Sequence, residues 1–164
     1  MSNLSSFVGP STITTATVTS CNASFFLNGL LLCSAANVPG LGEYCEGGHI
    51  ICKLSSSSVA WIVSPRCAEV SRTWYCREDA NTLAQSCTSR TGWFVPTISQ
   101  LDNPGYICRT YWDLNSRDSY WSSTESGSNA ACRVTFSTFY NTGISANTCK
   151  NTLLCVRSFR CVTY

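Results

Sequence analysis

Apolar runs separated by turn residues divide the chain beyond about residue 44 into short strands and two helices. Gly47–Leu54 and Val59–Ser64 are apolar runs joined by four serines, which is the pattern of a β-hairpin with a four-residue loop. Between Arg77 and Cys87, apolar side chains recur every three or four positions, as on the buried face of a helix. The pattern therefore predicts a hairpin followed by a first helix.

The stretch Thr91–Leu101 is expected to organise the rest of the chain, because an apolar run turns there into a second helix. A proline ends the apolar run Trp93–Val95. Thr97 and Gln100 then have the spacing of a capping box, in which each side chain accepts from the backbone N–H of the other residue. The sequence predicts a helix over Ile98–Asn103.

The C-terminal half has the alternation of strands only. Tyr120–Glu125 is one predicted strand, and Cys132–Ser137 is a second, with Val134 and Phe136 on one face. Leu153–Tyr164 is predicted as one long terminal strand. With the two helices before it, this half predicts an α+β fold in which two short helices pack on a twisted antiparallel sheet.

The N-terminal segment differs from the rest because no charged side chain occurs before Glu43. The turn cluster Val38–Gly42 marks the expected boundary, so we divide the chain into an arm (residues 1–44) and a domain (residues 45–164). The arm is either a strand pair packed on its own domain or an assembly arm buried against neighbouring subunits. Its apolar run is too short to span a membrane. The large apolar residues of that run are Phe25, Phe26, Leu27, Leu30, Leu31 and Leu32.

Composition narrows the classes of partner and cofactor. Only 12% of residues are charged, the net charge is +2 and no Lys/Arg run occurs, which argues against nucleic-acid binding. Twelve cysteines include no Cys-x-x-Cys pair, and His49 is the single histidine, so we expect no metal site and no cofactor. The cysteines are either disulfide partners or small buried hydrophobes. Without a visible signal peptide, synthesis in a host cytoplasm is expected.

The sequence offers no set of residues for catalysis, and we expect a non-enzymatic protein with no catalytic residue. His49 is interpreted as an edge-strand residue, with no serine, cysteine or carboxylate placed to work with it. Asp113 with Asp118, or Glu125 with either, forms a carboxylate pair that nothing places across a scissile bond. These carboxylates are interpreted as a solvated rim.

A segment that mixes aromatic and charged side chains is the candidate partner-binding face. Such mixtures are typical of contact hot spots, although the aromatic residues could instead be core and the charges a rim. The candidate residues are Tyr111, Trp112, Asp113, Arg117, Asp118, Phe139 and Tyr140.

The order of these motifs resembles that of the DUF1566 family. In that family a Trp-Arg-Leu-Pro-Thr helix start, a Tyr-Trp-Ser-Ser-Thr strand and a Val-Arg-x-Val-Arg terminal strand follow one another. Here Trp93–Thr97, Tyr120–Thr124 and Val156–Arg160 stand in that order, with Phe94 and Val95 in place of Arg-Leu. The resemblance covers about residues 47–164 and implies a C-type-lectin-like fold. It does not bring a calcium-dependent sugar site, because the Glu-Pro-Asn, Gln-Pro-Asp and Trp-Asn-Asp motifs are absent.

Domains of this family occur in phage virion proteins and in bacterial surface proteins, so the resemblance implies one of two functions. The first is a virion structural protein of a phage, acting in capsid decoration (cement) or as a tail-fibre or receptor-binding component. The alternative is a bacterial surface adhesin or carbohydrate-binding module. For the virion protein we expect other virion proteins as partners, a homo-oligomer with a trimer preferred over a dimer, and no membrane insertion. A host-surface glycan is a further candidate ligand.

Overall fold

The computed structural model describes residues 40–54, 58–112, 119–136 and 143–163. The strands form two sheets. The first has four antiparallel strands in the order β1 (Tyr44–Cys45), β2 (Gly48–Leu54), β3 (Val59–Val63) and β9 (Phe159–Thr163). The hairpin predicted from the two apolar runs is confirmed, since Leu54 pairs with Val59.

The second sheet has five strands. Their order is β4 (Val70–Arg72), β8 (Leu154–Val156), β5 (Ser119–Gly127), β6 (Ala130–Thr135) and β7 (Ile144–Cys149). Strand β8 runs parallel to β5, whereas the other neighbours are antiparallel. The described structure is therefore an α+β arrangement with mostly antiparallel sheets, as the sequence predicts in outline.

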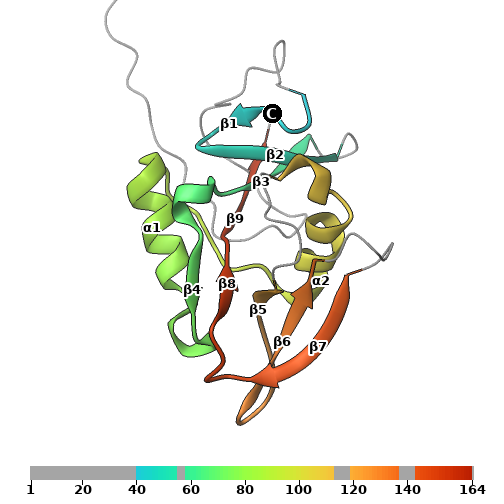
Figure 1. The fold of residues 1–164 in the computed structure, drawn as a ribbon. Helices are drawn as coiled ribbons and strands as arrows, with labels where there is room; N and C mark the ends of the chain where they lie inside the picture. Colours follow the sequence, from blue (N-terminus) through green and yellow to red (C-terminus); the bar gives the residue numbers. More distant parts are fainter. Residues whose placement is uncertain (1–39, 55–57, 113–118, 137–142, 164) are drawn as a thin grey trace, which may run out of the picture.

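Two helices flank the C-terminal strands. Helix α1 (Asp79–Thr88) lies on one side of β8 and β9 in Figure 1, and α2 (Ile98–Gln100) lies on the other. The predicted capping box is confirmed, because the backbone N–H of Thr97 donates to Gln100 Oε1 (2.9 Å) and that of Gln100 donates to Thr97 Oγ1 (3.3 Å). After α2 the chain continues as a π-helical segment, η3 (Leu101–Tyr106), in which Asn103 has a non-helical backbone (φ −139°, ψ 112°) and marks a kink. The helical stretch that begins at Ile98 is thus interrupted at Asn103, where the sequence predicts its end.

Three single turns of 3-10 helix complete the described elements. They are η1 (Arg66–Ala68), η2 (Trp74–Cys76) and η4 (Arg109–Tyr111). Turn η1 packs against α1, and η4 packs against β2. These turns carry several of the side chains considered below.

The prediction of one long terminal strand is wrong. Strand β8 ends at Val156 and β9 begins at Phe159, so the chain passes from one sheet to the other through Arg157 and Ser158. Both of these residues are buried. The Ser64 backbone N–H donates to the Ser158 carbonyl oxygen (2.9 Å), and Arg157 Nε donates to the Ser64 carbonyl oxygen (3.1 Å). These long-range contacts hold the chain where it passes from the five-stranded sheet into the four-stranded sheet.

The stretch 91–101 contacts all three clusters of the core. Trp93 packs with the cluster beneath α1, Val95 packs with the cluster of the five-stranded sheet, and Phe94 packs against the largest, aromatic cluster. Phe94 and Phe159 also exchange backbone hydrogen bonds of 3.0 and 2.8 Å. Adjacent residues on this short bridge point in different directions, which is how one segment joins three clusters.

Candidate functional site

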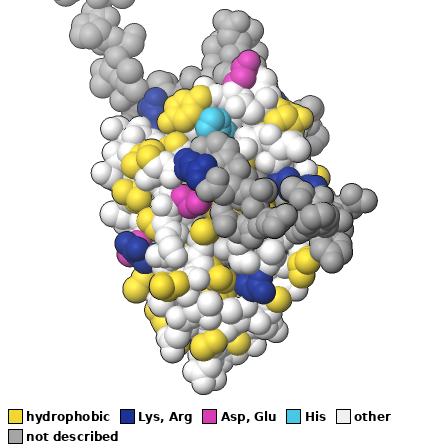
Figure 2. Space-filling view, viewed as in Figure 1, with side chains coloured by type: hydrophobic (Ala, Val, Ile, Leu, Met, Phe, Trp, Pro, Cys, Tyr) yellow, Lys and Arg dark blue, Asp and Glu magenta, His cyan; other side chains and the backbone are white. Residues whose placement is uncertain are grey.

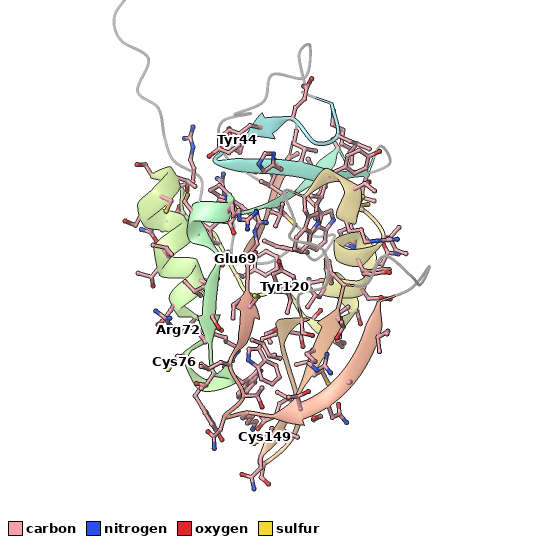
Figure 3. The ribbon with its side chains drawn as sticks, in the orientation of Figure 1. Tyr44, Glu69, Arg72, Cys76, Tyr120 and Cys149 are labelled. Carbon is pink, nitrogen blue, oxygen red and sulfur yellow. The ribbon has the colours of Figure 1, made fainter. Side chains whose placement is uncertain are left out.

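A group of exposed aromatic and apolar side chains lies at the β1–β2 end of the domain. Leu41 is 42% exposed, Tyr44 is 57% exposed and Tyr111 is 36% exposed, and His49 lies half-buried between them. We call Leu41, Tyr44, His49 and Tyr111 the aromatic surface. Figure 2 shows the histidine at the surface beside hydrophobic side chains, and Figure 3 labels Tyr44 at this end of the molecule.

The turn at Gly42 holds the aromatic surface together. Gly42 has a left-handed φ of 83°, and a Cβ atom on it would lie 3.3 Å from Cδ1 of Tyr111. The Tyr111 ring therefore lies close against this turn. The carbonyl oxygen of Gly42 lies 3.1 Å from His49 Nδ1, and its backbone N–H donates to the Ile50 carbonyl oxygen (2.7 Å). Glycine suits the site because a side chain would strain the backbone and crowd Tyr111.

Tyr44 and His49 face each other across the β1–β2 pair. Their rings meet edge to face, with centroids 5.5 Å apart. Burial raises the pKa of Tyr44, and the nearby thiols of Cys67 and Cys87 raise it further. The phenol therefore stays neutral at physiological pH. His49 is not the edge residue that the sequence suggested, because β1 pairs on one side of it and β3 on the other.

A buried ion pair supports this end of the domain from beneath. Glu46, at a left-handed φ of 58° after β1, is buried together with Arg160 of β9. Arg160 Nη1 donates to both the carboxylate and the carbonyl oxygen of Glu46, each at 3.0 Å, and Arg90 Nε lies 3.7 Å from the same carboxylate. Burial lowers the pKa of Arg160, an effect that Glu46 opposes. The contacts fasten the β1–β2 turn to β9 and to the end of α1.

The structure separates two neighbouring residues that the sequence analysis placed in one binding face. Tyr111 is on the aromatic surface, whereas Trp112 is 6% exposed and belongs to the aromatic core. Trp112 is therefore a core residue, as the alternative interpretation of this segment predicts. The other predicted contact residues (Asp113, Arg117, Asp118, Phe139 and Tyr140) lie outside the described residues, as do the six large apolar residues of the arm.

Trp112 is surrounded by aromatic rings. Its ring centroid lies 5.7 Å from that of Tyr120, 5.0 Å from that of Phe136 and 5.4 Å from that of Phe159. The guanidinium of Arg157 lies 5.6 Å from the Trp112 ring. Tilted and edge-to-face rings at such distances stabilise a core beyond the area that they bury. Trp112 therefore joins the passage between β8 and β9 to the five-stranded sheet.

A second buried polar group lies in the middle of the molecule. The hydroxyl of Tyr120 donates to Glu69 Oε2 (2.8 Å), and Arg157 Nη1 lies 3.8 Å from the same oxygen. Figure 3 shows Glu69 and Tyr120 here, away from Tyr44. Burial, and then the Glu69 charge, raise the pKa of Tyr120 far above its ordinary value. Each partner is engaged within the network, which fits a structural role.

The sequence analysis missed Leu41 and Tyr44 as surface residues and interpreted His49 only as a strand residue. A usable signal was present, because Tyr44 follows the Gly40-Leu41-Gly42 turn with only Glu43 between them and has no neighbouring apolar run to pack with. Of the three carboxylates considered for catalysis, Asp113 and Asp118 lie outside the described residues. The side chain of Glu125 is exposed and forms an ion pair with the buried Lys150.

Within the described ranges, no three His, Cys, Asp or Glu side chains gather in a way that could hold a metal ion. The helices of the described part include none with the length and apolar character needed to cross a membrane. No protein-family model matches the chain, and no curated protein matches it. Function is therefore inferred from the residues of this chain and their geometry.

Proposed function

We propose that this chain is a non-enzymatic structural protein of a phage virion, a capsid decoration protein or a tail-fibre component, that assembles as a homo-oligomer. The observation that carries the proposal is the aromatic surface itself. Three exposed large side chains sit on a base fixed by the buried Glu46–Arg160 ion pair, at the place where the uncharged N-terminal segment enters the domain. Rigid aromatic residues on a fixed base are typical of contact surfaces, because ordering them on binding costs little entropy.

We further propose that the domain has a C-type-lectin-like fold of the DUF1566 type. The three motifs behind the resemblance occupy connected positions. Trp93–Thr97 leads into the capped helix α2, Tyr120–Thr124 lies on β5 in the middle of its sheet, and Val156–Arg160 joins the two sheets. Strands β1 and β9 belong to one sheet, and Figure 1 shows β9 running from the middle of the molecule toward the end where β1 lies. This supports a domain whose ends lie close together.

The proposed occupant of the aromatic surface is the apolar run Phe25–Leu32 of a second copy of the chain. This run places six large apolar side chains within eight residues, and burying each stabilises the assembly by about 1.5–3 kcal/mol. The aromatic surface begins at Leu41, nine positions along the chain after the end of this run. Exchange of arms between copies would bring run and surface together. A closed ring of exchanged arms suits a cyclic oligomer, and we prefer a trimer to a dimer.

The electrostatics of the aromatic surface suit an uncharged occupant. Glu43, the acidic residue within this turn, accepts a hydrogen bond from the Gly40 backbone N–H (2.6 Å) through its carboxylate. The phenol of Tyr44 is neutral at physiological pH, since its pKa is raised. The Glu43 carboxylate thus has a hydrogen-bond partner in this turn, and the Tyr44 phenol adds no charge to the surface that an apolar segment would cover.

The second candidate function is a surface adhesin or carbohydrate-binding module. The partly exposed rings of Tyr44 and Tyr111 favour it, because aromatic rings also stack on the apolar faces of sugars. A glycan would compete with the arm for the same surface. Binding of a glycan panel by a chain that is monomeric at micromolar concentration would favour the adhesin over the virion protein.

Deleting Met1–Ala36 tests the assembly function. We expect the full chain to sediment as an oligomer at micromolar concentration, and the shortened chain to stay folded and sediment as a monomer. A point variant refines the test, since Leu31→Asp should weaken assembly while Thr14→Asp, outside the apolar run, should not. A full chain that is monomeric, together with a shortened chain that does not fold, would show that the arm belongs to the domain.

A further inference from the structure

Two cysteine thiols meet where η1 packs against α1, beside the aromatic surface. Cys67 lies in η1, and Cys87 lies in the last turn of α1. The two thiols are hydrogen bonded to each other, both cysteines are free, and both are exposed. Thiols in hydrogen-bonding reach need little movement to reach the separation of a disulfide.

We propose that Cys67 and Cys87 form a redox site, in which a small-molecule disulfide of the oxidised-glutathione class converts the pair into a disulfide that fastens α1 to η1. The Cys67 thiolate attacks one sulfur of the small disulfide, forms a mixed disulfide and releases one small thiolate. Cys87 then gives its proton to solvent and attacks the Cys67 sulfur, which expels the second small thiolate. Two protein thiols are oxidised, and one small disulfide is reduced to two thiols.

The roles of the two sulfurs follow from their hydrogen bond. The hydrogen bond with Cys67 raises the pKa of Cys87, and burial and the charge of Cys67 raise it further. A raised pKa disfavours the thiolate of Cys87. The first attack is therefore assigned to Cys67, and Cys87 resolves the mixed disulfide.

A second pair of thiols in the same chain provides a comparison. Cys52 in β2 and Cys108 after η3 are also hydrogen bonded, but both are only partly exposed. Burial, and then the nearby Cys52, raise the pKa of Cys108 to about 11. Less thiolate and less access both slow exchange with a small disulfide, so the Cys67–Cys87 pair reacts first.

The position of the Cys67–Cys87 pair links its redox state to the aromatic surface. Both thiols lie close enough to Tyr44 to raise its pKa. A bridge between them would fix the contact of η1 with α1 next to that ring, and it would remove two titrating groups from its surroundings. The redox site thus adjoins the surface proposed for assembly, although its chemistry does not depend on that proposal.

Peptide mapping of the full chain tests the redox site directly. The reduced protein is mixed with oxidised glutathione, quenched with iodoacetamide at intervals and cut with trypsin. Cleavage after Arg66, Arg72, Arg77 and Arg90 places Cys67 in peptide 67–72, Cys76 in peptide 73–77 and Cys87 in peptide 78–90. We expect one species that joins peptides 67–72 and 78–90, formed before any species that joins the peptides of Cys52 and Cys108. Dithiothreitol should separate it again.

Two variants and one physical measurement complete the test. Cys149→Ser, an exposed cysteine labelled at the opposite end of the molecule from Tyr44 in Figure 3, should leave the joined species unchanged. In the Cys87→Ser variant the reaction should stop at the mixed disulfide, with one glutathione bound to peptide 67–72. The bridge should raise the Tm of the wild-type chain by roughly 6–12 °C. The proposal would be overturned if iodoacetamide still alkylated both Cys67 and Cys87 after treatment with oxidised glutathione. A bridge from either residue to another cysteine, or an unchanged Tm, would also overturn it.

Discussion

Tyr111 and Trp112 are neighbours in the sequence, yet they belong to two different aromatic groups. Tyr111 lies on the aromatic surface against the Gly42 turn, whereas Trp112 packs among Tyr120 and other rings of the core. The surface group is held in place by backbone turns and by the ion pair beneath it. The core group is held by ring contacts on several sides.

The comparison shows that residue type alone does not tell whether an aromatic side chain packs in the core or lies on a binding surface. Both groups contain tyrosine, and both lie beside charged residues in the sequence. The two groups differ in when the rings are buried. A ring that is buried on folding stabilises the fold, whereas a ring that stays exposed can stabilise a complex when a partner covers it. Substitutions in the core should therefore change stability, and substitutions on the surface should change assembly.

The largest expected effect is on Trp112. Trp112→Ala should lower the free energy of unfolding by about 3–5 kcal/mol, because it removes a large ring from a packed aromatic cluster and leaves a cavity. Urea denaturation followed by fluorescence or circular dichroism measures the loss. Tyr111→Ala is the matched control and should cost under about 1 kcal/mol. Equal costs for the two variants would mean that the separation into core and surface is wrong.

Local signals in the sequence predicted the local structure well. The Thr97–Gln100 capping box and the hairpin Gly47–Ser64 depend on residues that lie near one another in the chain, and both are confirmed. The separation of Tyr111 from Trp112 depends on which ring meets Phe136 and Phe159, residues distant in the sequence. No period or motif within the segment carries that information.

The break in the terminal strand also depends on contacts between residues that are distant in the sequence. Apolar and β-branched residues on both sides of Arg157 and Ser158 favour one continuous strand over Leu153–Tyr164. The break arises because Arg157 and Ser158 find partners on Ser64, more than 90 positions away in the sequence. Glu46 and Arg160, whose pairing fixes the base of the aromatic surface, are likewise joined only by the fold. The sequence therefore indicates which residue types could form a site, but only the fold shows which of these residues lie together.

A smaller effect is expected for Tyr120, which belongs to the core but also carries a polar group. Tyr120→Phe should lower the free energy of unfolding by about 1.5–3 kcal/mol at pH 7, because its hydroxyl donates to the charged Glu69 in a buried site. The ring contacts with Trp112 and Phe136 are retained in this variant. A cost close to that of Trp112→Ala would indicate that the hydrogen bond, rather than ring packing, dominates this cluster.

The pH dependence of the same variant gives an independent check. The pKa of Tyr120 is raised in the folded chain, so its neutral form stabilises the fold fully below the unfolded pKa of about 10. That stabilisation is lost as the pH rises above 10 toward the folded pKa, by up to about 1.4 kcal/mol per pH unit. Wild-type protein should therefore lose stability above pH 10 more steeply than Tyr120→Phe. Identical alkaline slopes would mean that Tyr120 ionises freely in the folded chain.

The smallest expected effect on stability, and the most direct test of the proposed assembly surface, comes from replacing Tyr44 and Tyr111 together by alanine. Tyr75→Ala is the matched control, since Tyr75 is 55% exposed but lies in η2, outside the aromatic surface. The measurement is sedimentation velocity of the full chain at micromolar concentration. The proposed function predicts that the double variant melts within a few degrees of the wild type but sediments as a monomer, whereas Tyr75→Ala remains an oligomer. A double variant that assembles like the wild type would contradict it.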